Sequence, residues 1–232
     1  MSKKSRPAMA IVADEVAKDY GGLVALEPLS LEIAHGERVA LVGHNGSGKT
    51  TFLKMAAGLL EPSDGSISVF GTPAGKEDAR RRLSWLSDTP TFYDDLSVME
   101  HLEFIAQLHG VEDWTAWASR LLEWLGIEHR ADDLPTRFSR GLRQKAAIAL
   151  AWIRPFDVLL VDEPFVGLDS AGKTALVELF DEASGTGASL VVATHELSFV
   201  QRVDRVIALR DGSVVFDGRP NDVDVEELVR PV

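Results

Sequence analysis

The stretch Gly43-His44-Asn45-Gly46-Ser47-Gly48-Lys49-Thr50 fits the pattern G-x-x-x-x-G-K-[ST], which describes a glycine loop that surrounds a phosphate group. The apolar run 39–42 before it predicts a buried strand, and residues 51–57 after it predict a helix. The alternative is an ordinary glycine-rich turn before a helix, and the buried strand in front of the loop argues against it. A strand, a glycine loop and a helix N-terminus together predict a phosphate site.

The residue types in this loop suit a triphosphate. Gly43, Gly46 and Gly48 let the chain bend so that several backbone N–H groups point at one anion. Lys49 brings a positive charge to the outer phosphates, and the Thr50 hydroxyl is a suitable ligand for Mg²⁺. The dipole of the following helix adds partial positive charge at the same place.

The composition is typical of a globular chain. Its 232 residues are 45% hydrophobic, and no apolar run approaches the roughly 18 residues that cross a bilayer, so we expect a cytosolic chain without a membrane span. The absence of cysteine excludes disulfides, thiolate catalysis and cysteine zinc sites. A formal net charge of −12 argues against nucleic acid as a partner, because nucleic-acid-binding surfaces usually carry a basic patch.

The order of predicted elements indicates an α/β fold. Short strands come first, a helical stretch follows, and strands then alternate with helices, which is typical of a mostly parallel sheet covered by helices. We expect one domain over 1–232, with a core lobe over 1–87 and 156–232 and an inserted helical lobe over 88–155. The expected strands are 10–16, 29–33, 39–42, 66–70, 158–161, 189–193, 206–209 and 214–216, and the longer helices are 98–108, 113–125, 139–152 and 170–183. Residues 221–232 predict a short acidic helix or tail.

Two carboxylates, Asp162 and Glu163, directly follow the apolar run 158–161. Because the ends of parallel strands meet at one edge of a sheet, we expect both beside the phosphate loop. There Asp162 would hold Mg²⁺ through water, and Glu163 would orient and deprotonate an attacking water. His195 follows another predicted strand and would hydrogen-bond the γ-phosphate and that water. The alternatives are two solvated acids at a strand end and a structural histidine.

In order and spacing, these segments resemble the ATP-binding-cassette (ABC) ATPases, the nucleotide-binding subunits of transporters. The most specific element is Phe138-Ser139-Arg140-Gly141-Leu142-Arg143-Gln144-Lys145, which is similar to the family's signature motif Leu-Ser-Gly-Gly-Gln. The resemblance covers essentially the whole chain. It implies a P-loop NTPase cassette of the ABC type, with a RecA-like core, an N-terminal antiparallel β subdomain and an inserted helical subdomain. With ATP and Mg²⁺ as cofactors, the expected ATP contacts are Tyr20, Gly43, His44, Asn45, Gly46, Ser47, Gly48, Lys49, Thr50 and Thr51.

The resemblance also implies a head-to-tail dimer formed on ATP binding. The residues expected to contact the partner's ATP are Ser139, Arg140, Gly141 and Leu142. Asp169 would communicate across the interface. Tyr20 would stack on adenine, a contact worth on the order of 1–3 kcal/mol; its alternative role is that of a loop tyrosine.

Helical spacing and the family resemblance suggest two further surfaces. Residues at helical spacing would form the inner face of the helical lobe: Trp114, Trp117, Leu121 and Trp124 or Leu125. In the family, a groove between the lobes receives a short helix of the membrane subunit. We expect that groove to be lined by Phe92, Tyr93 or Leu96.

Three residues depart from the family pattern. Arg140 and Leu142 replace a glycine and the glutamine of the signature. Asp88 stands where the family usually has a glutamine that contacts Mg²⁺ and water, and an ionised carboxylate accepts hydrogen bonds but cannot donate one. The Ser-Arg-Gly-Leu-Arg-Gln form resembles the exporter-like branch, which includes haem-exporter-type and multidrug-type ATPases.

We therefore expect an ATPase that powers export through separate membrane subunits, at the inner face of the cell membrane. One alternative is a soluble ABC protein acting on ribosomes or DNA, a class that usually has two cassettes in one chain or a long coiled-coil insertion. The formal net charge of −12 argues against that class, because proteins that bind nucleic acid usually carry a basic patch. The other alternative is a nucleotide-dependent switch with weak hydrolysis; Glu163 argues against it, whereas Asp88 and Arg140 are compatible with it.

Overall fold

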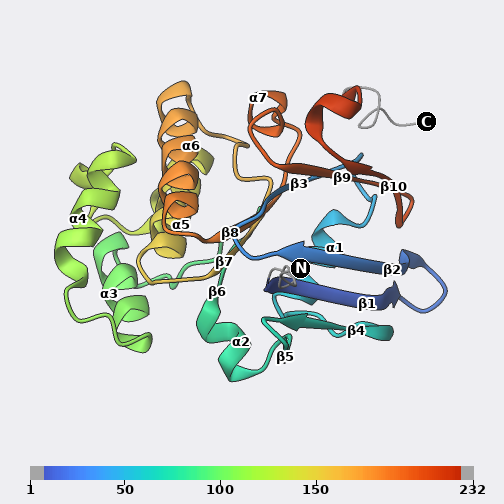
Figure 1. The fold of residues 1–232 in the computed structure, drawn as a ribbon. Helices are drawn as coiled ribbons and strands as arrows, with labels where there is room; N and C mark the ends of the chain where they lie inside the picture. Colours follow the sequence, from blue (N-terminus) through green and yellow to red (C-terminus); the bar gives the residue numbers. More distant parts are fainter. Residues whose placement is uncertain (1–7, 226–232) are drawn as a thin grey trace, which may run out of the picture.

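The computed structural model describes residues 8–225, and residues 226–232 of the expected acidic tail lie outside them. Figure 1 shows strands in two sheets, with α3 and α4 at one end of the molecule and β1, β2 and β4 at the other. The strands are β1 (Met9–Asp19), β2 (Val24–Ala34), β3 (Arg38–Val42), β4 (Asp64–Val69), β5 (Thr72–Pro73), β6 (Leu83–Leu86), β7 (Val158–Asp162), β8 (Ser189–Ala193), β9 (Arg205–Arg210) and β10 (Ser213–Gly218). The helices are α1 (Lys49–Ala56), α2 (Glu77–Arg82), α3 (Val98–Leu108), α4 (Trp114–Trp124), α5 (Arg140–Trp152), α6 (Ser170–Gly185) and α7 (Leu197–Val200).

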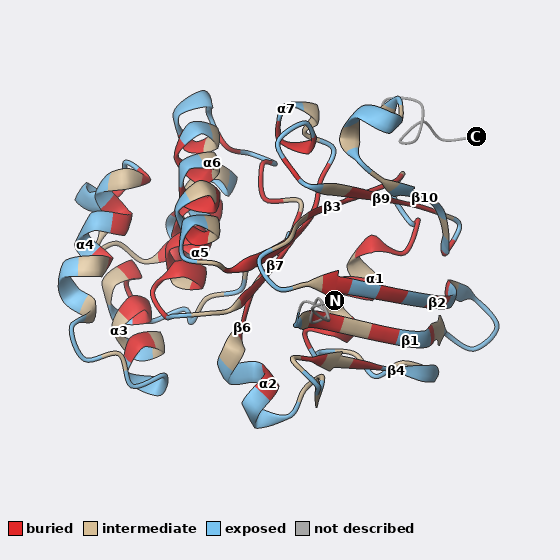
Figure 2. Cartoon of the chain, in the orientation of Figure 1, coloured by how far each residue is buried: buried red, intermediate tan, exposed pale blue. Residues whose placement is uncertain are grey.

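The larger sheet has the strand order β10-β9-β3-β8-β7-β6. Its strands β6, β7, β8, β3 and β9 pair in parallel, and β10 pairs with β9 in the antiparallel direction. Every residue of β7 and β8 is buried, and Figure 2 shows β7 as a continuously buried strand. Helices cover a parallel sheet on both faces, which explains why these strands appear in the sequence as unbroken apolar runs.

The smaller sheet is antiparallel, with the order β2-β1-β4-β5. On β2, Leu29, Leu31 and Ile33 alternate with exposed residues and point into an apolar core. The same core contains Phe52 and Leu53 of α1 together with alternate residues of β3 and β7. Helix α1 is therefore held between the two sheets, and its N-terminus is fixed where the phosphate loop meets it.

The helices α3, α4 and α5 pack together with the other face of the parallel sheet in a second core. Of the predicted inner face, Leu121 and Leu125 are buried. The three tryptophans are only partly buried, and two of them donate their indole N–H groups to polar partners. Trp117 Nε1 donates to Trp152 O at 2.9 Å, and Trp124 Nε1 donates to Glu178 Oε2 at 2.7 Å.

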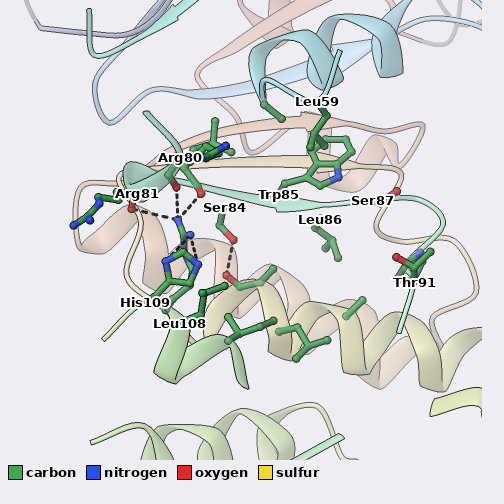
Figure 3. Close-up of a pocket in the computed structure, with 18 of the residues that line it drawn as sticks. Leu59, Arg80, Arg81, Ser84, Trp85, Leu86, Ser87, Thr91, Leu108 and His109 are labelled. Atoms are coloured by element: carbon green, nitrogen blue, oxygen red, sulfur yellow. Dashed lines mark hydrogen bonds between the residues drawn. The ribbon is translucent and has the colours of Figure 1, made fainter. Parts of the chain in front are cut away.

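Arg154, which follows α5, connects three elements through one buried guanidinium group. Its Nη2 donates to Arg80 O at 3.0 Å, to Arg81 O at 3.3 Å and to Leu83 O, at the end of α2 and the start of β6. Its Nη1 donates to His109 Nε2 at 2.8 Å, at the end of α3. Figure 3 shows these hydrogen bonds converging beside Arg80, Arg81 and His109. Burial lowers the pKa of His109, and the charges of Arg154 and Arg81 lower it further, so the neutral ring accepts the hydrogen bond from Arg154 Nη1.

We expect Arg154→Met to lower the free energy of unfolding by about 2–4 kcal/mol, because it leaves several backbone carbonyls without their charged donor. Urea unfolding monitored by circular dichroism measures this change. Arg81→Met is the matched control, since it removes a neighbouring arginine whose partner Glu77 is on the exposed surface. Equal effects from the two substitutions would contradict the connecting role of Arg154.

Candidate functional site

The phosphate loop between β3 and α1 has a backbone that requires glycine. Gly43, Gly46 and Gly48 have φ angles of 147°, 85° and 105°. A Cβ atom at Gly43 would lie 2.1 Å from Leu209 O, and one at Gly48 would lie 2.8 Å from Ala25 O. The loop is thus pressed against β9 and β2, and a side chain at either position would push it out of place.

Lys49 carries the positive charge of the loop. Its Nζ donates to Gly43 O at 2.6 Å and to His44 O at 3.2 Å, and only 6% of the residue is exposed. Burial lowers the pKa of Lys49, while the charges of Glu163 and Asp162 raise it. The ammonium group is therefore held inside the curve of the loop, in the field of two carboxylates.

Thr50 and Asp162 come together at the start of α1 and the end of β7. Thr50 Oγ1 donates to Asp162 Oδ2 at 2.6 Å. Asp162 is fully buried, and its Oδ1 atom has no hydrogen-bond partner. Burial raises the pKa of Asp162 and the Thr50 hydroxyl lowers it, whereas the charges of Asp88 and Glu163 raise it further. A buried, unpaired carboxylate oxygen next to a hydroxyl is a donor set that fits a hard cation such as Mg²⁺.

Glu163 and His195 lie on neighbouring strand ends. Glu163 N donates to Ala193 O at 2.8 Å, and Glu163 Oε1 lies 3.0 Å from His195 Nε2. Glu163 has a φ angle of 45°, a left-handed conformation that is uncommon for a residue with a long side chain. Such conformations persist where the surrounding structure enforces them, and they cluster at functional sites.

Asp88 lies in the loop after β6, on the same side as Asp162. Its Oδ1 accepts hydrogen bonds from Thr89 Oγ1 at 2.8 Å and from Ser87 Oγ at 3.1 Å. Because its charge raises the pKa of Asp162, the two carboxylates share one electrostatic environment.

The signature residues begin α5. Ser139 is the N-cap, and its Oγ accepts a hydrogen bond from Leu142 N at 3.4 Å. A Cβ atom at Gly141 would lie 2.5 Å from Gly167 O, so this helix start touches the loop that leads to Asp169. The first N–H groups of a helix have no partner within the helix, so a helix N-terminus of this kind favours an anion.

Asp169 caps the next long helix, α6. Its Oδ1 accepts a hydrogen bond from Gly172 N at 2.8 Å and lies 3.1 Å from Lys145 Nζ of α5. The Gly172 N–H lowers the pKa of Asp169, and Lys145 lowers it further. The start of α6 and the signature helix are therefore tied together, a contact that the sequence did not indicate.

Tyr20 and the turn between β9 and β10 complete the description of the site. Tyr20 is 52% exposed at the turn before β2, with Lys18 Nζ 5.2 Å from the ring centroid. The turn between β9 and β10 supports the loop from behind, because Gly212 N donates to Ser47 O at 3.2 Å. Nothing in the pattern of the predicted hairpin indicated that it would contact the phosphate loop.

A groove of about 1180 Å³ runs between β6, α2, α3 and α5. Its lining includes Trp85 and Leu86 of β6 and Leu108 and His109 at the end of α3, as Figure 3 shows. Phe92 lines this groove, and both Phe92 and Tyr93 line a smaller adjoining cavity.

Of the three residues expected as alternatives for this lining, Leu96 lines neither cavity. The capping box formed by Ser97 and Glu100 ties the chain to the start of α3 immediately after Leu96, and Leu96 is only partly exposed there.

Comparison with known proteins agrees with this architecture. Residues 26–166 match the family model described as ABC transporter. One similar protein is the SkfA peptide export ATP-binding protein SkfE of Bacillus subtilis, which is 35% identical; the match covers 87% of this chain and 86% of that protein. Another is the phosphonates import ATP-binding protein PhnC 2 of Synechococcus, which is 33% identical; the match covers 90% of this chain and 84% of that protein. A solved structure of the ATP-binding subunit of an ABC transporter aligns with a TM-score of 0.88 and 31% identity, covering 94% of this chain and 97% of that one.

The fold and the glycine loop define a P-loop NTPase with an ABC-type cassette. The chain belongs to the ABC transporter family and is an ATP-hydrolysing subunit that powers a transporter. The predicted family, fold class and ATPase activity are confirmed. None of the helices found within residues 8–225 is both long and apolar enough to cross a membrane.

Proposed function

We propose that this chain hydrolyses ATP at the phosphate loop and powers export through separate membrane subunits. The observation that carries this proposal is the meeting of Thr50 with Asp162, beside the paired side chains of Glu163 and His195. These residues come from α1, β7 and the segment after β8, and they converge at one edge of the parallel sheet, where ligands bind in such folds.

Within the site, Thr50 and Asp162 are the residues that would hold Mg²⁺, since Asp162 Oδ1 has no other partner. When held by these residues, Mg²⁺ would supply positive charge to the outer phosphate oxygens. Lys49 adds a second positive charge there, and the loop's N–H groups orient the phosphates. Asp88 accepts hydrogen bonds near Asp162 and would help to orient water at the site.

Glu163 would accept the proton of the attacking water. Its Oε1 atom lies 3.0 Å from His195 Nε2, so the imidazole lies beside the base, and the other carboxylate oxygen would face the water. Tyr20 would stack on the adenine ring, for which its exposure is suitable.

A second copy of the chain would complete each ATP site. The start of α5, with Ser139 as cap and Arg140 as an added positive charge, forms an anion site of its own. In the proposed dimer, the residues that contact the partner's ATP are Ser139, Arg140, Gly141 and Leu142. Asp169, tied to α5 through Lys145, would transmit changes at this interface to α6.

The groove beside α2 and α3 would receive a short helix of a membrane subunit. This arrangement would hold the chain at the inner face of the membrane, and it agrees with a helical lobe over 88–155 inserted into a core lobe over 1–87 and 156–232. The direction of export is supported by relatives named as exporters of a peptide and of Nod factor, although a phosphonate importer is also similar. The exporter-like form of the signature favours the same direction.

We expect removal of Mg²⁺ with EDTA to abolish ATP turnover, and Asp162→Asn to lower it about a hundredfold, because a neutral amide binds a hard cation weakly. Phosphate release measures turnover, and ATP binding in EDTA shows whether the site is otherwise intact. The matched control is Asp157→Asn, just before β7 at the other end of the strand, where the side chain pairs with Arg82. Full turnover by Asp162→Asn would contradict the proposal.

A further inference from the structure

On the N-terminal side of His195, hydrogen bonds of Thr194 hold the chain in place. Thr194 N donates to Leu41 O of β3 at 3.1 Å, and Thr194 Oγ1 accepts a hydrogen bond from Glu196 N at 3.0 Å. The side chain of His195 itself is 39% exposed, so little packing fixes its direction. Its position therefore depends on how firmly its neighbours in the chain are held.

On the other side of His195, Glu196 is bound through both of its carboxylate oxygens. Lys173 Nζ of α6 donates to Glu196 Oε2, and Ser198 Oγ donates to Glu196 Oε1 at 3.0 Å. The hydrogen bond from Lys173 is the main cause that lowers the pKa of Glu196. Glu196 thus attaches the chain to α6 directly beside His195.

The start of α6 is also attached to α5, the helix that begins with the signature residues. Asp169, the cap of α6, pairs with Lys145 of α5, and Lys173 N donates to Asp169 O at 2.9 Å in the first turn of α6. One helical turn therefore has an ion pair to α5 at its beginning and an ion pair to the residue after His195 at its end.

We propose that Lys173 is a positioning residue for ATP hydrolysis, which acts through Glu196 to hold His195 against Glu163. The inference rests on the proposed function, because it requires His195 to take part in hydrolysis. Without Lys173, the residue next to His195 loses its ion pair to α6, and the 3.0 Å approach of His195 to Glu163 is no longer maintained. Small displacements of a catalytic group have large effects on rate, whereas most of the proposed ATP contacts lie on the phosphate loop, outside this segment.

The test compares the steady-state ATP turnover of full-length variants. Lys173→Met is expected to lower kcat about fivefold, as for a partly exposed ion pair, with no change in the KM for ATP. Lys173→Arg, which keeps the charge, is expected to retain most of the activity. The double exchange Lys173→Glu with Glu196→Lys is expected to recover the rate that either single exchange loses.

The matched control is Arg202→Met, which breaks another ion pair to α6, at Asp181, and should leave kcat unchanged.

A double-mutant cycle with His195→Ala separates positioning from simple stabilisation. If Lys173 acts through His195, adding Lys173→Met to His195→Ala causes no further loss of kcat. An equal loss in both backgrounds, or a fall in kcat that follows the melting temperature, would overturn the inference. Full activity of His195→Ala would instead remove the catalytic role of His195, a failure of the proposed function that this cycle distinguishes from a failure of the Lys173 inference.

Discussion

The Glu163→Gln variant is expected to turn over ATP at least about a hundredfold more slowly than the unaltered chain, because an amide cannot accept the proton of the attacking water. Glutamine has nearly the same shape as glutamate, and Glu163 does not belong to the phosphate loop. ATP binding should therefore remain. Phosphate release and equilibrium binding of a fluorescent ATP analogue measure the two properties separately.

The control for this variant is Glu182→Gln, the same exchange on the exposed surface of α6. It should hydrolyse ATP at the unaltered rate. If Glu163→Gln did the same, Glu163 could not be the base. If the unaltered chain bound ATP but released almost no phosphate, the chain would be a nucleotide-dependent switch, and the proposed role of Glu163 in hydrolysis would be wrong.

Lys49→Ala is expected to weaken ATP binding about a hundredfold, and to abolish measurable turnover at ordinary ATP concentrations. Lys49 Nζ is buried inside the loop, where a charge about 4 Å from a phosphate contributes roughly 4 kcal/mol at an effective dielectric constant near 20. Part of that energy is lost to desolvation, and a remaining loss of about 3 kcal/mol corresponds to roughly a hundredfold in the dissociation constant. Isothermal titration with ATP measures it.

Lys54→Ala is the matched control, since Lys54 belongs to the same helix but lies in its last turn. It should bind ATP with nearly unchanged affinity. Unchanged affinity in Lys49→Ala would show that the loop does not surround the phosphates. Together with Glu163→Gln, this variant separates loss of binding from loss of chemistry.

The parts of the fold that could be predicted from sequence are those with a strong local signal. Helix α3 (Val98–Leu108) and strand β8 (Ser189–Ala193) have the predicted bounds, because a capping box starts the first and an unbroken apolar run forms the second. The alternation on β2 was visible only from Leu29 onward, and the strand begins earlier, where pairing with β1 rather than side-chain pattern sets its length.

Helix α2 and strand β6 were not predicted. Helix α2 (Glu77–Arg82) has six residues, and its charged side chains give no apolar face. Strand β6 (Leu83–Leu86) has four residues and includes a buried Ser84 whose hydroxyl donates to Ala151 O at 2.8 Å. Both elements depend on tertiary partners, among them Arg154, that are far away in the sequence.

In the site, too, some contacts could be predicted from the sequence and others could not. That Thr50 and Asp162 should meet could be predicted, because the ends of parallel strands share an edge. The pairs Lys145–Asp169 and Lys173–Glu196 could not, since each joins residues on different elements whose approach depends on how the helices pack. Charged residues on helices are common on any surface, and only the structure distinguishes the ones that hold a segment in place.

The proposal that two chains share each ATP is tested most directly by the mass of Glu163→Gln in solution, measured by size exclusion with light scattering. Blocked hydrolysis should keep ATP in place, so we predict a mass near the 25.3 kDa of one chain without nucleotide and twice that mass with excess Mg·ATP. Adding Ser139→Arg, which blocks the start of α5, should prevent the increase. A mass that stays at one chain while ATP is bound would contradict the account.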